Sequence, residues 1–147
     1  MGGMIDLNAP IVPAKSAAGV SIGDSVAPLL ATIRPRSTRT LYFGESHDLG
    51  EIRVWAKDGV VYQIGVYSGY RGILEPNIHI GSSIADVENS FGCTVQEDED
   101  DNLVVPNSRG WCFETEEWRA PMTVSNNRQR QIVSIFIFNP DPILGDK

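Results

Sequence analysis

The chain carries Val20-Ser21-Ile22-Gly23-Asp24-Ser25-Val26, and it repeats this pattern 58 residues later as Ile78-His79-Ile80-Gly81-Ser82-Ser83-Ile84. Each copy has two apolar residues separated by a polar one, then a glycine, polar residues and another apolar residue. Glycine tolerates the left-handed backbone that a sharp turn needs, and serine and aspartate are preferred helix N-caps. The pattern therefore predicts, twice, an extended segment that turns at glycine into a helix.

The residues after each glycine indicate how each helix begins and ends. In the first copy we expect Asp24 or Ser25 as the N-cap, with Pro28 tolerated in the first turn. In the second copy we expect Ser82 or Ser83 as the N-cap, with Asp86 favourably placed near the positive end of the helix dipole. The apolar face of this second helix is made of Ile84, Val87 and Phe91, and Gly92 is the expected C-cap.

Runs rich in β-branched and aromatic residues follow each helix. Residues 51–56 and 60–67 flank Lys57-Asp58-Gly59, and an Asp-Gly pair between such runs predicts a β-hairpin. Residues 131–138 are apolar at nearly every position, which is typical of a central strand covered on both sides. Weaker strands are expected at 41–43, 102–105 and 111–115.

These elements predict an α+β fold in which two tandem helix-plus-antiparallel-meander repeats lie side by side around a pseudo-twofold. The expected organisation is an extended N-terminal surface arm (residues 4–18), a first repeat (19–75) and a second repeat (76–147), all within one compact domain.

Composition narrows the classes of function. The 147 residues carry a formal net charge of -7, which disfavours binding to the phosphate backbone of nucleic acids. The sequence contains no apolar run long enough to cross a membrane, and its first residues do not resemble a secretory signal. We therefore expect a cytoplasmic bacterial protein that contacts neither nucleic acid nor membrane.

Motifs for catalysis or metal binding are weak. Glu45-Ser46-His47-Asp48 has the residue types of a hydrolase triad, but adjacent residues cannot form a relay, and a polar loop is the simpler interpretation. Asp98, Asp100 and Asn102 copy three positions of a calcium loop whose required glycine and glutamate are missing. Cys93 and Cys112 are expected to be reduced. The sequence therefore predicts no metal, no cofactor and no enzymatic activity.

Acidic residues gather in the second half of the chain. Residues 97–117 hold eight carboxylates and one arginine, a net charge of -7. Aromatic residues lie among them, and aromatic anchors surrounded by charge are typical of protein interfaces. We therefore predict a partner-binding patch made of Asp98, Glu99, Asp100, Asp101, Glu116, Glu117 and Trp118. Two alternatives stay open: the segment is a solubilising loop, or Trp111 and Phe113 belong to the core.

The repeated turn-and-helix unit, at residues 19–33 and 78–92, resembles the superfold of beta-lactamase inhibitory protein and the SmpA/OmlA proteins. Residues 5–23, which begin Ile5-Asp6-Leu7-Asn8-Ala9-Pro10, resemble the start of small bacterial immunity proteins encoded beside polymorphic or contact-delivered toxins. This resemblance implies a cytosolic inhibitor that binds one toxin domain and blocks its active site.

Two functions follow from these observations. The first is an acidic immunity protein that binds and neutralises a cognate basic toxin, for example a nuclease. An acidic surface attracts a basic partner electrostatically and can occupy a groove that otherwise binds phosphate. The alternative is a non-enzymatic protein-interaction or assembly adaptor module.

Overall fold

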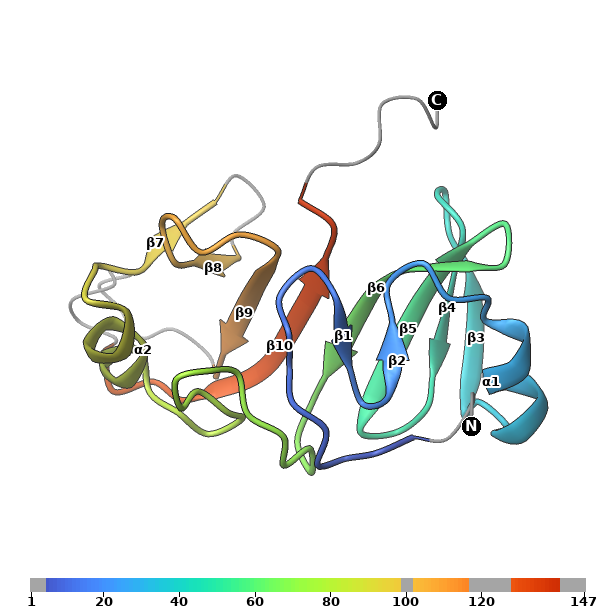
Figure 1. Cartoon of the computed structure of the whole chain (residues 1–147), viewed down its shortest axis with the longest axis horizontal. Coiled ribbons are helices and arrows are strands. Elements are labelled where there is room, and N and C mark those ends of the chain that lie inside the picture. The colour runs from blue at the N-terminus through green and yellow to red at the C-terminus, as the bar shows by residue number, and fades with distance from the viewer. Residues whose placement is uncertain (1–4, 99–101, 117–127, 141–147) are drawn as a thin grey trace.

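The computed structural model describes residues 5–98, 102–116 and 128–140. Within these ranges the strands are β1 (Ser16–Ala17), β2 (Val20–Ser21), β3 (Ser37–Thr40), β4 (Glu45–Asp48), β5 (Ile52–Lys57), β6 (Val60–Val66), β7 (Gln96–Glu97), β8 (Leu103–Val104), β9 (Trp111–Thr115) and β10 (Ile132–Phe138). The helices are α1 (Ala27–Thr32) and α2 (Ile84–Phe91). Strands β3 to β10 form one antiparallel sheet in the order β3-β4-β5-β6-β10-β9-β8-β7, and β1 pairs with β2 (Figure 1).

The predicted α+β class, with two helix-plus-meander repeats side by side, is wrong. The described residues are mostly β, and the helices have only six and eight residues. Strand β6 pairs directly with β10, from Ile135 opposite Val66 to Phe138 opposite Gln63, so all eight strands belong to a single sheet. The helices are short because the C-cap of α1 is Ile33, two residues before Pro35, and the C-cap of α2 is the left-handed Gly92.

The two predicted glycine turns do occupy equivalent places. Gly23 and Gly81 have φ angles of 98° and 101°, which favour glycine. The Gly23 N–H donates to the Val61 carbonyl at 2.8 Å, and the Gly81 N–H donates to the Ile132 carbonyl at 2.9 Å. Each turn is therefore attached to the beginning of one of the two central strands, β6 or β10.

The predicted helix caps and the predicted strand at residues 41–43 had different outcomes. In α2, Ser83 is the N-cap, one of the two residues expected there, and it forms a capping box with Asp86 in which both hydrogen bonds are 3.0 Å long. In α1 the predicted cap is wrong, because Val26 is the N-cap and the Asp24 carboxylate accepts from Ser21 N–H instead. The expected strand at 41–43 is also wrong: Leu41 N–H bonds to the Gly44 carbonyl, in the turn between β3 and β4.

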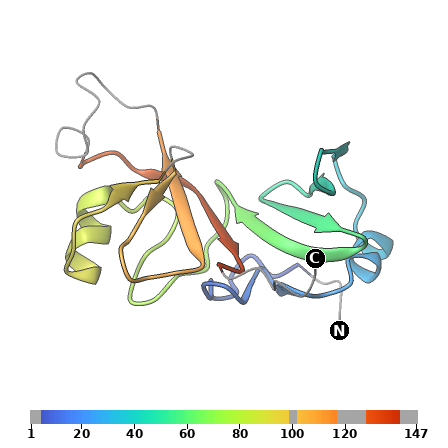
Figure 2. The ribbon, with the colours of Figure 1, turned by 90° about the horizontal axis from the view of Figure 1, so that it is seen from above.

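The two faces of the sheet differ. One face, here the covered face, buries side chains such as Val54, Ile64, Phe113 and Ile135. Helices α1 and α2 and the N-terminal segment contribute to the same core, and this segment crosses the central strands on one side (Figures 1 and 2). The other face, here the open face, consists of Arg53, Trp55, Gln63, Gly65, Tyr67, Cys112, Glu114, Ser134, Phe136 and Phe138.

The N-terminal segment is fixed to the core by Tyr70. Ile11, Ala17 and Ala18 are buried, although an extended surface arm was expected there. The Tyr70 hydroxyl accepts a hydrogen bond from the Ala18 N–H at 2.8 Å and donates one to the Ala9 carbonyl at 2.6 Å. One buried phenol therefore joins the loop after β6 to two points of the N-terminal segment.

Tyr70→Phe is expected to lower the free energy of unfolding by about 1–2 kcal/mol, because the buried Ala18 N–H loses its acceptor while the ring packing is kept. Urea denaturation measures this, with Tyr42→Phe as the control because Tyr42 is fully exposed. Equal stability of the two variants would show that the phenol does not fix the segment.

Candidate functional site

The predicted acidic patch is only partly within the described residues. Glu99, Asp100, Asp101, Glu117 and Trp118 lie outside them. Asp98 follows β7 and lines a pocket on the open face. Glu116 does not line this pocket: its carboxylate accepts from the Gln131 N–H at 3.0 Å and lies 3.7 Å from the Arg130 guanidinium. The structure therefore separates these two acids, one in the pocket and one bonded to the segment before β10.

Trp111 and Phe113, the aromatic residues among the acids, are core residues. Their side chains lie on the covered face and their rings stack with centroids 5.6 Å apart. The Trp111 ring also lies 5.8 Å from that of Phe91 in α2, and its indole N–H donates to the Ser108 hydroxyl. The alternative that Trp111 and Phe113 belong to the core is therefore confirmed for both residues.

An aromatic cluster occupies the centre of the open face. The Phe136 ring contacts both Trp55 and Tyr67, and each of these rings meets it edge to face with centroids 5.9 Å apart. All three side chains are half-buried. Edge-to-face pairs stabilise one another beyond the area that they bury, so the cluster is a preformed apolar platform.

Gly65 makes room for this platform. It pairs with Phe136 on one side and with Arg53 on the other. A Cβ atom at Gly65 would lie 2.9 Å from the Phe136 ring and 3.1 Å from the Trp55 ring. The missing side chain lets both rings lie low over the sheet, which is a positional reason for glycine in the middle of a strand.

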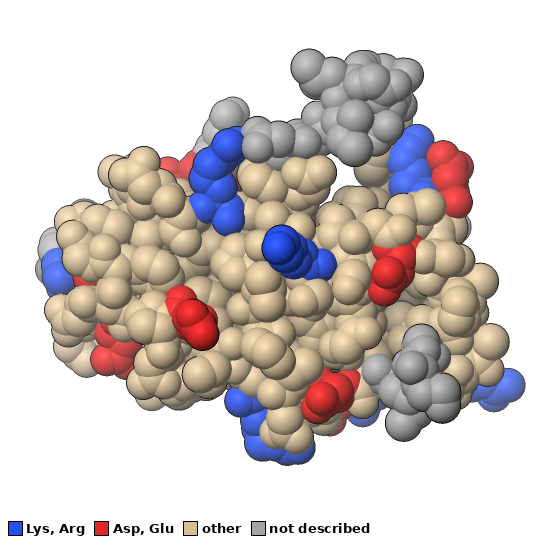
Figure 3. Space-filling model, viewed as in Figure 1, with Lys and Arg blue, Asp and Glu red and all other residues tan. Residues whose placement is uncertain are grey.

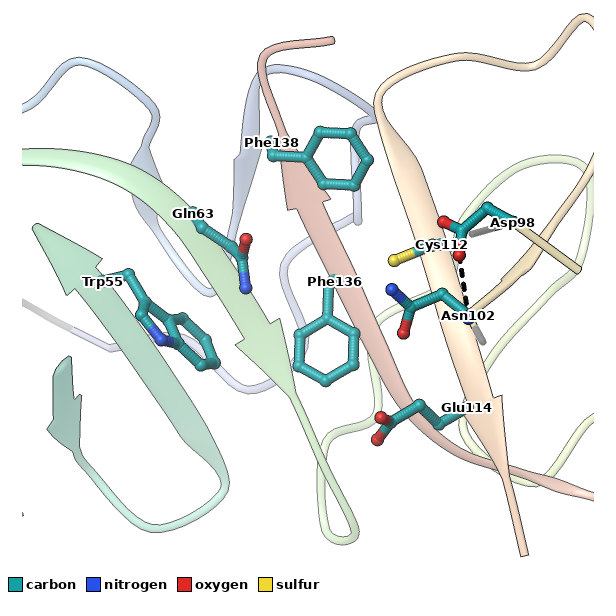
Figure 4. Close-up of a pocket in the computed structure, with 8 residues that line it drawn as sticks. All are labelled: Trp55, Gln63, Asp98, Asn102, Cys112, Glu114, Phe136 and Phe138. Atoms are coloured by element: carbon teal, nitrogen blue, oxygen red, sulfur yellow. Dashed lines mark hydrogen bonds between the residues drawn. The ribbon is translucent and has the colours of Figure 1, made fainter. Parts of the chain in front are cut away.

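Trp55 and Phe136 of this cluster line a pocket of about 490 Å³. The pocket extends over β5, β6, β10 and β9 to Asp98 and Asn102 (Figure 4). Its lining combines rings, amides, carboxylates and one thiol: Trp55, Gln63, Asp98, Asn102, Cys112, Glu114, Phe136 and Phe138. Asp98 and Asn102 are tied together, because the Asn102 N–H donates to Asp98 Oδ1 at 3.0 Å and the Asp98 N–H donates to the Asn102 carbonyl at 2.9 Å.

Charge is distributed unevenly along the open face. At the β5 side, the Arg53 guanidinium lies 5.9 Å from the Trp55 ring centroid and 3.5 Å from the Asp48 carboxylate. At the β9 side, burial, together with the nearby carboxylates of Asp98 and Glu114, raises the pKa of the Cys112 thiol to about 12. Burial is also the main cause that raises the pKa of Tyr67 to about 12. The pocket is therefore acidic near β9, its Cys112 thiol is neutral at pH 7, and so is the Tyr67 phenol that contacts Phe136.

Alkylation should distinguish the two cysteines, which are both free thiols. The raised pKa leaves very little Cys112 thiolate at pH 8, and the thiolate is the reactive form. We expect iodoacetamide to modify the half-buried Cys93 at least about tenfold faster than Cys112 in the folded protein. Mass spectrometry of timed digests measures both rates, and equal rates in urea are the control. Faster modification of Cys112 would contradict this acidic, desolvated environment.

The residues that resemble a hydrolase triad do not form one. They belong to strand β4 rather than to the expected loop, so Ser46 and His47 point to opposite faces of the sheet. The His47 ring is buried, with Nδ1 3.0 Å from the Thr38 hydroxyl and Nε2 2.7 Å from the Glu45 carboxylate. No group of three or more potential metal ligands occurs in the part of the chain that the structure describes.

The open face of the sheet was not predicted from the sequence. Residues 131–138 were interpreted as covered on both sides, whereas Phe136 and Phe138 remain half-exposed. A signal was present in β6, where Gln63 and Gly65 interrupt an apolar run at alternate positions. Those two residues share one face of the strand, and this marks the face of the sheet without a covering layer.

Comparison with known proteins adds a structural neighbour but no family. No family model and no curated protein sequence matches the chain. The fold is similar to the crystal structure of the uncharacterized protein YfeY from Escherichia coli, with a TM-score of 0.60 and 14% sequence identity over 88% of this chain and 99% of that one. At this identity the likeness shows the fold alone. Within the described residues, no helix is long and apolar enough to span a membrane.

Proposed function

We propose that this protein is a cytosolic, non-enzymatic inhibitor that holds a basic toxin domain against its open face. The single observation that supports this best is the half-buried cluster of Trp55, Tyr67 and Phe136 beside the acidic side of the pocket. Aromatic anchors contribute most of the binding energy in protein interfaces, while surrounding charges steer the approach of the partner.

The open face is better suited to a partner than the covered side. Figure 3 shows the covered side, where charged side chains of both signs are scattered over a mostly uncharged surface. On the open face, carboxylates and half-buried aromatic rings occur together in one hollow. The net charge of -7 adds a general attraction for basic partners, which raises association rates at low salt.

A binding role is also supported by the state of the nucleophiles in the pocket. Cys112 is protonated at neutral pH, since its pKa is about 12, and a thiol acts as a nucleophile only as the thiolate. The Ser134 hydroxyl is buried and donates to Glu114 Oε1 at 2.8 Å. Neither group is arranged as an activated nucleophile.

The identity of the partner as a toxin rests on the resemblance of residues 5–23 to immunity proteins and on charge. The assembly adaptor is the competing proposal, and the two differ in the number and kind of partners. An immunity protein binds one cognate toxin tightly and abolishes its activity, whereas an adaptor holds several components and inhibits none.

The experiment uses the protein encoded by the open reading frame immediately upstream of this gene. Its purified C-terminal domain should bind the full chain in calorimetry with one site, and its toxic activity should disappear at a one-to-one ratio. Binding without loss of activity would favour the adaptor. If the two proteins did not bind, and cells that lack this gene grew normally in the presence of the toxin, the inhibitor role would be refuted.

A further inference from the structure

We propose that the pocket on the open face receives an arginine side chain of the protein partner, with its guanidinium between the Phe136 ring and the Glu114 carboxylate. This inference rests on the proposed function, because it assigns a binding mode to the same face. It specifies one chemical group, a planar cation, where the proposed function requires only a basic partner.

The apolar side of this site is the Phe136 ring, which Trp55 and Tyr67 both contact edge to face. Aromatic faces attract cations, and guanidinium groups stack on them. The open face already contains one such contact of the chain's own, in which the Arg53 guanidinium lies over Trp55. A second guanidinium on Phe136 would extend the same arrangement toward β9.

The acidic side is formed by Glu114, with Asp98 nearby. The Ser134 hydroxyl donates to Glu114 Oε1 at 2.8 Å, so this exposed carboxylate is positioned before a ligand arrives. In Figure 4 the Glu114 carboxylate points toward the Phe136 ring. A carboxylate facing a ring across a pocket can pair with the edge of a guanidinium while the ring contacts its plane.

The amide side chains favour arginine over lysine. Gln63 and Asn102 belong to the same lining, and the Asn102 amide is directed toward Phe136 in Figure 4. A guanidinium carries five N–H donors in one plane, so it can donate to an amide oxygen and a carboxylate together. Lysine offers a compact, strongly hydrated point charge that cannot stack in this way.

The test titrates the full chain with Nα-acetyl-arginine N-methylamide and follows the indole N–H signal of Trp55 by NMR, assigned with Trp55→Phe. A saturable shift is expected in the millimolar range, which is typical of a weak small ligand. The lysine analogue should bind several-fold more weakly, and the neutral citrulline analogue should give no saturable shift. Saturable binding of citrulline as tight as that of arginine would overturn the inference.

Two variants locate the site. Glu114→Gln keeps the size of the side chain and its bond to Ser134, and it should weaken arginine binding about tenfold because one charge-assisted hydrogen bond is lost. Phe136→Leu should weaken it several-fold, after thermal melting has shown that the variant is folded. The matched control is Glu75→Gln, an exposed acid outside the open face, which should change nothing.

The outcomes separate this inference from the proposed function. If the arginine probe does not bind but Glu114→Lys still weakens binding of the toxin domain, the inference is wrong and the proposed function stands. If the probe binds but pocket variants leave the toxin domain unaffected, the pocket serves a free small cation. That result would contradict both the proposal that the pocket binds an arginine of the partner and the proposal that the partner binds the open face.

Discussion

Trp111→Ala is expected to lower the free energy of unfolding by about 3–5 kcal/mol, the cost of removing a large buried aromatic side chain. Trp111 is only 2% exposed, and its ring packs between those of Phe91 and Phe113. Its loss would also leave the Ser108 hydroxyl without the indole donor. Urea denaturation followed by far-ultraviolet circular dichroism measures the change.

Trp111→Phe provides a milder variant in case the alanine variant does not fold. It keeps most of the buried surface, and its expected cost is about 1–2 kcal/mol. Val133→Ala serves as the control on the neighbouring central strand, because Val133 is 42% exposed. If Trp111→Ala were as stable as the wild type but lost its partner, Trp111 would be a binding anchor and the core described here would be incorrect.

Glu88→Ala is expected to lower the free energy of unfolding by about 2–3 kcal/mol, a large effect for an acidic residue in a short helix. The Glu88 side chain is only 5% exposed, it pairs with the Arg128 guanidinium, and its Oε2 accepts from the Val95 N–H at 2.8 Å. The substitution leaves that buried N–H without an acceptor and removes the attachment of α2 to Arg128. Because the Arg128 side chain is 46% exposed, solvent limits the loss from the ion pair.

Two variants separate the role of Glu88 from that of helix propensity. Glu88→Gln can still accept from Val95 N–H, so it should lose less stability than Glu88→Ala. Asn89→Ala changes the next, exposed position of α2 and should lie within about 0.5 kcal/mol of the wild type. Equal stability of Glu88→Ala and the wild type would show that this buried carboxylate does not attach α2 to the chain around it.

Local structure was predictable from the sequence where a few neighbouring residues decide it. The Asp58-Gly59 turn joins β5 and β6 with φ angles of 52° and 80°, as the dipeptide indicates. The N-cap of α2 was predicted in the same way, because Ser83 was one of the two serines expected there. The pairing of β6 with β10 was not predictable, because residues 69 to 75 positions apart must meet, and no short pattern encodes such a contact. That pairing is what makes one sheet out of two expected units.

The candidate site shows the same limit. The sequence placed function in the acidic segment because charge and aromatic residues are adjacent there along the chain. In the structure, alternate residues of β9 separate: Trp111 and Phe113 enter the core, while Cys112 and Glu114 face the pocket. The rings that line the pocket together with these acids, Trp55 and Phe136, come from the strands β5 and β10.

We expect the open face to bind a basic protein partner. The most direct measurement is the affinity of the toxin domain for Glu114→Lys compared with Glu75→Lys, which makes the same charge change at an exposed position outside the open face. We expect Glu114→Lys to weaken binding at least tenfold and to reduce its salt dependence, since a repulsive charge replaces an attractive one. The control should stay within about twofold of the wild type. If both variants weaken binding equally, only the net charge of the protein matters, and the open face is not the interface.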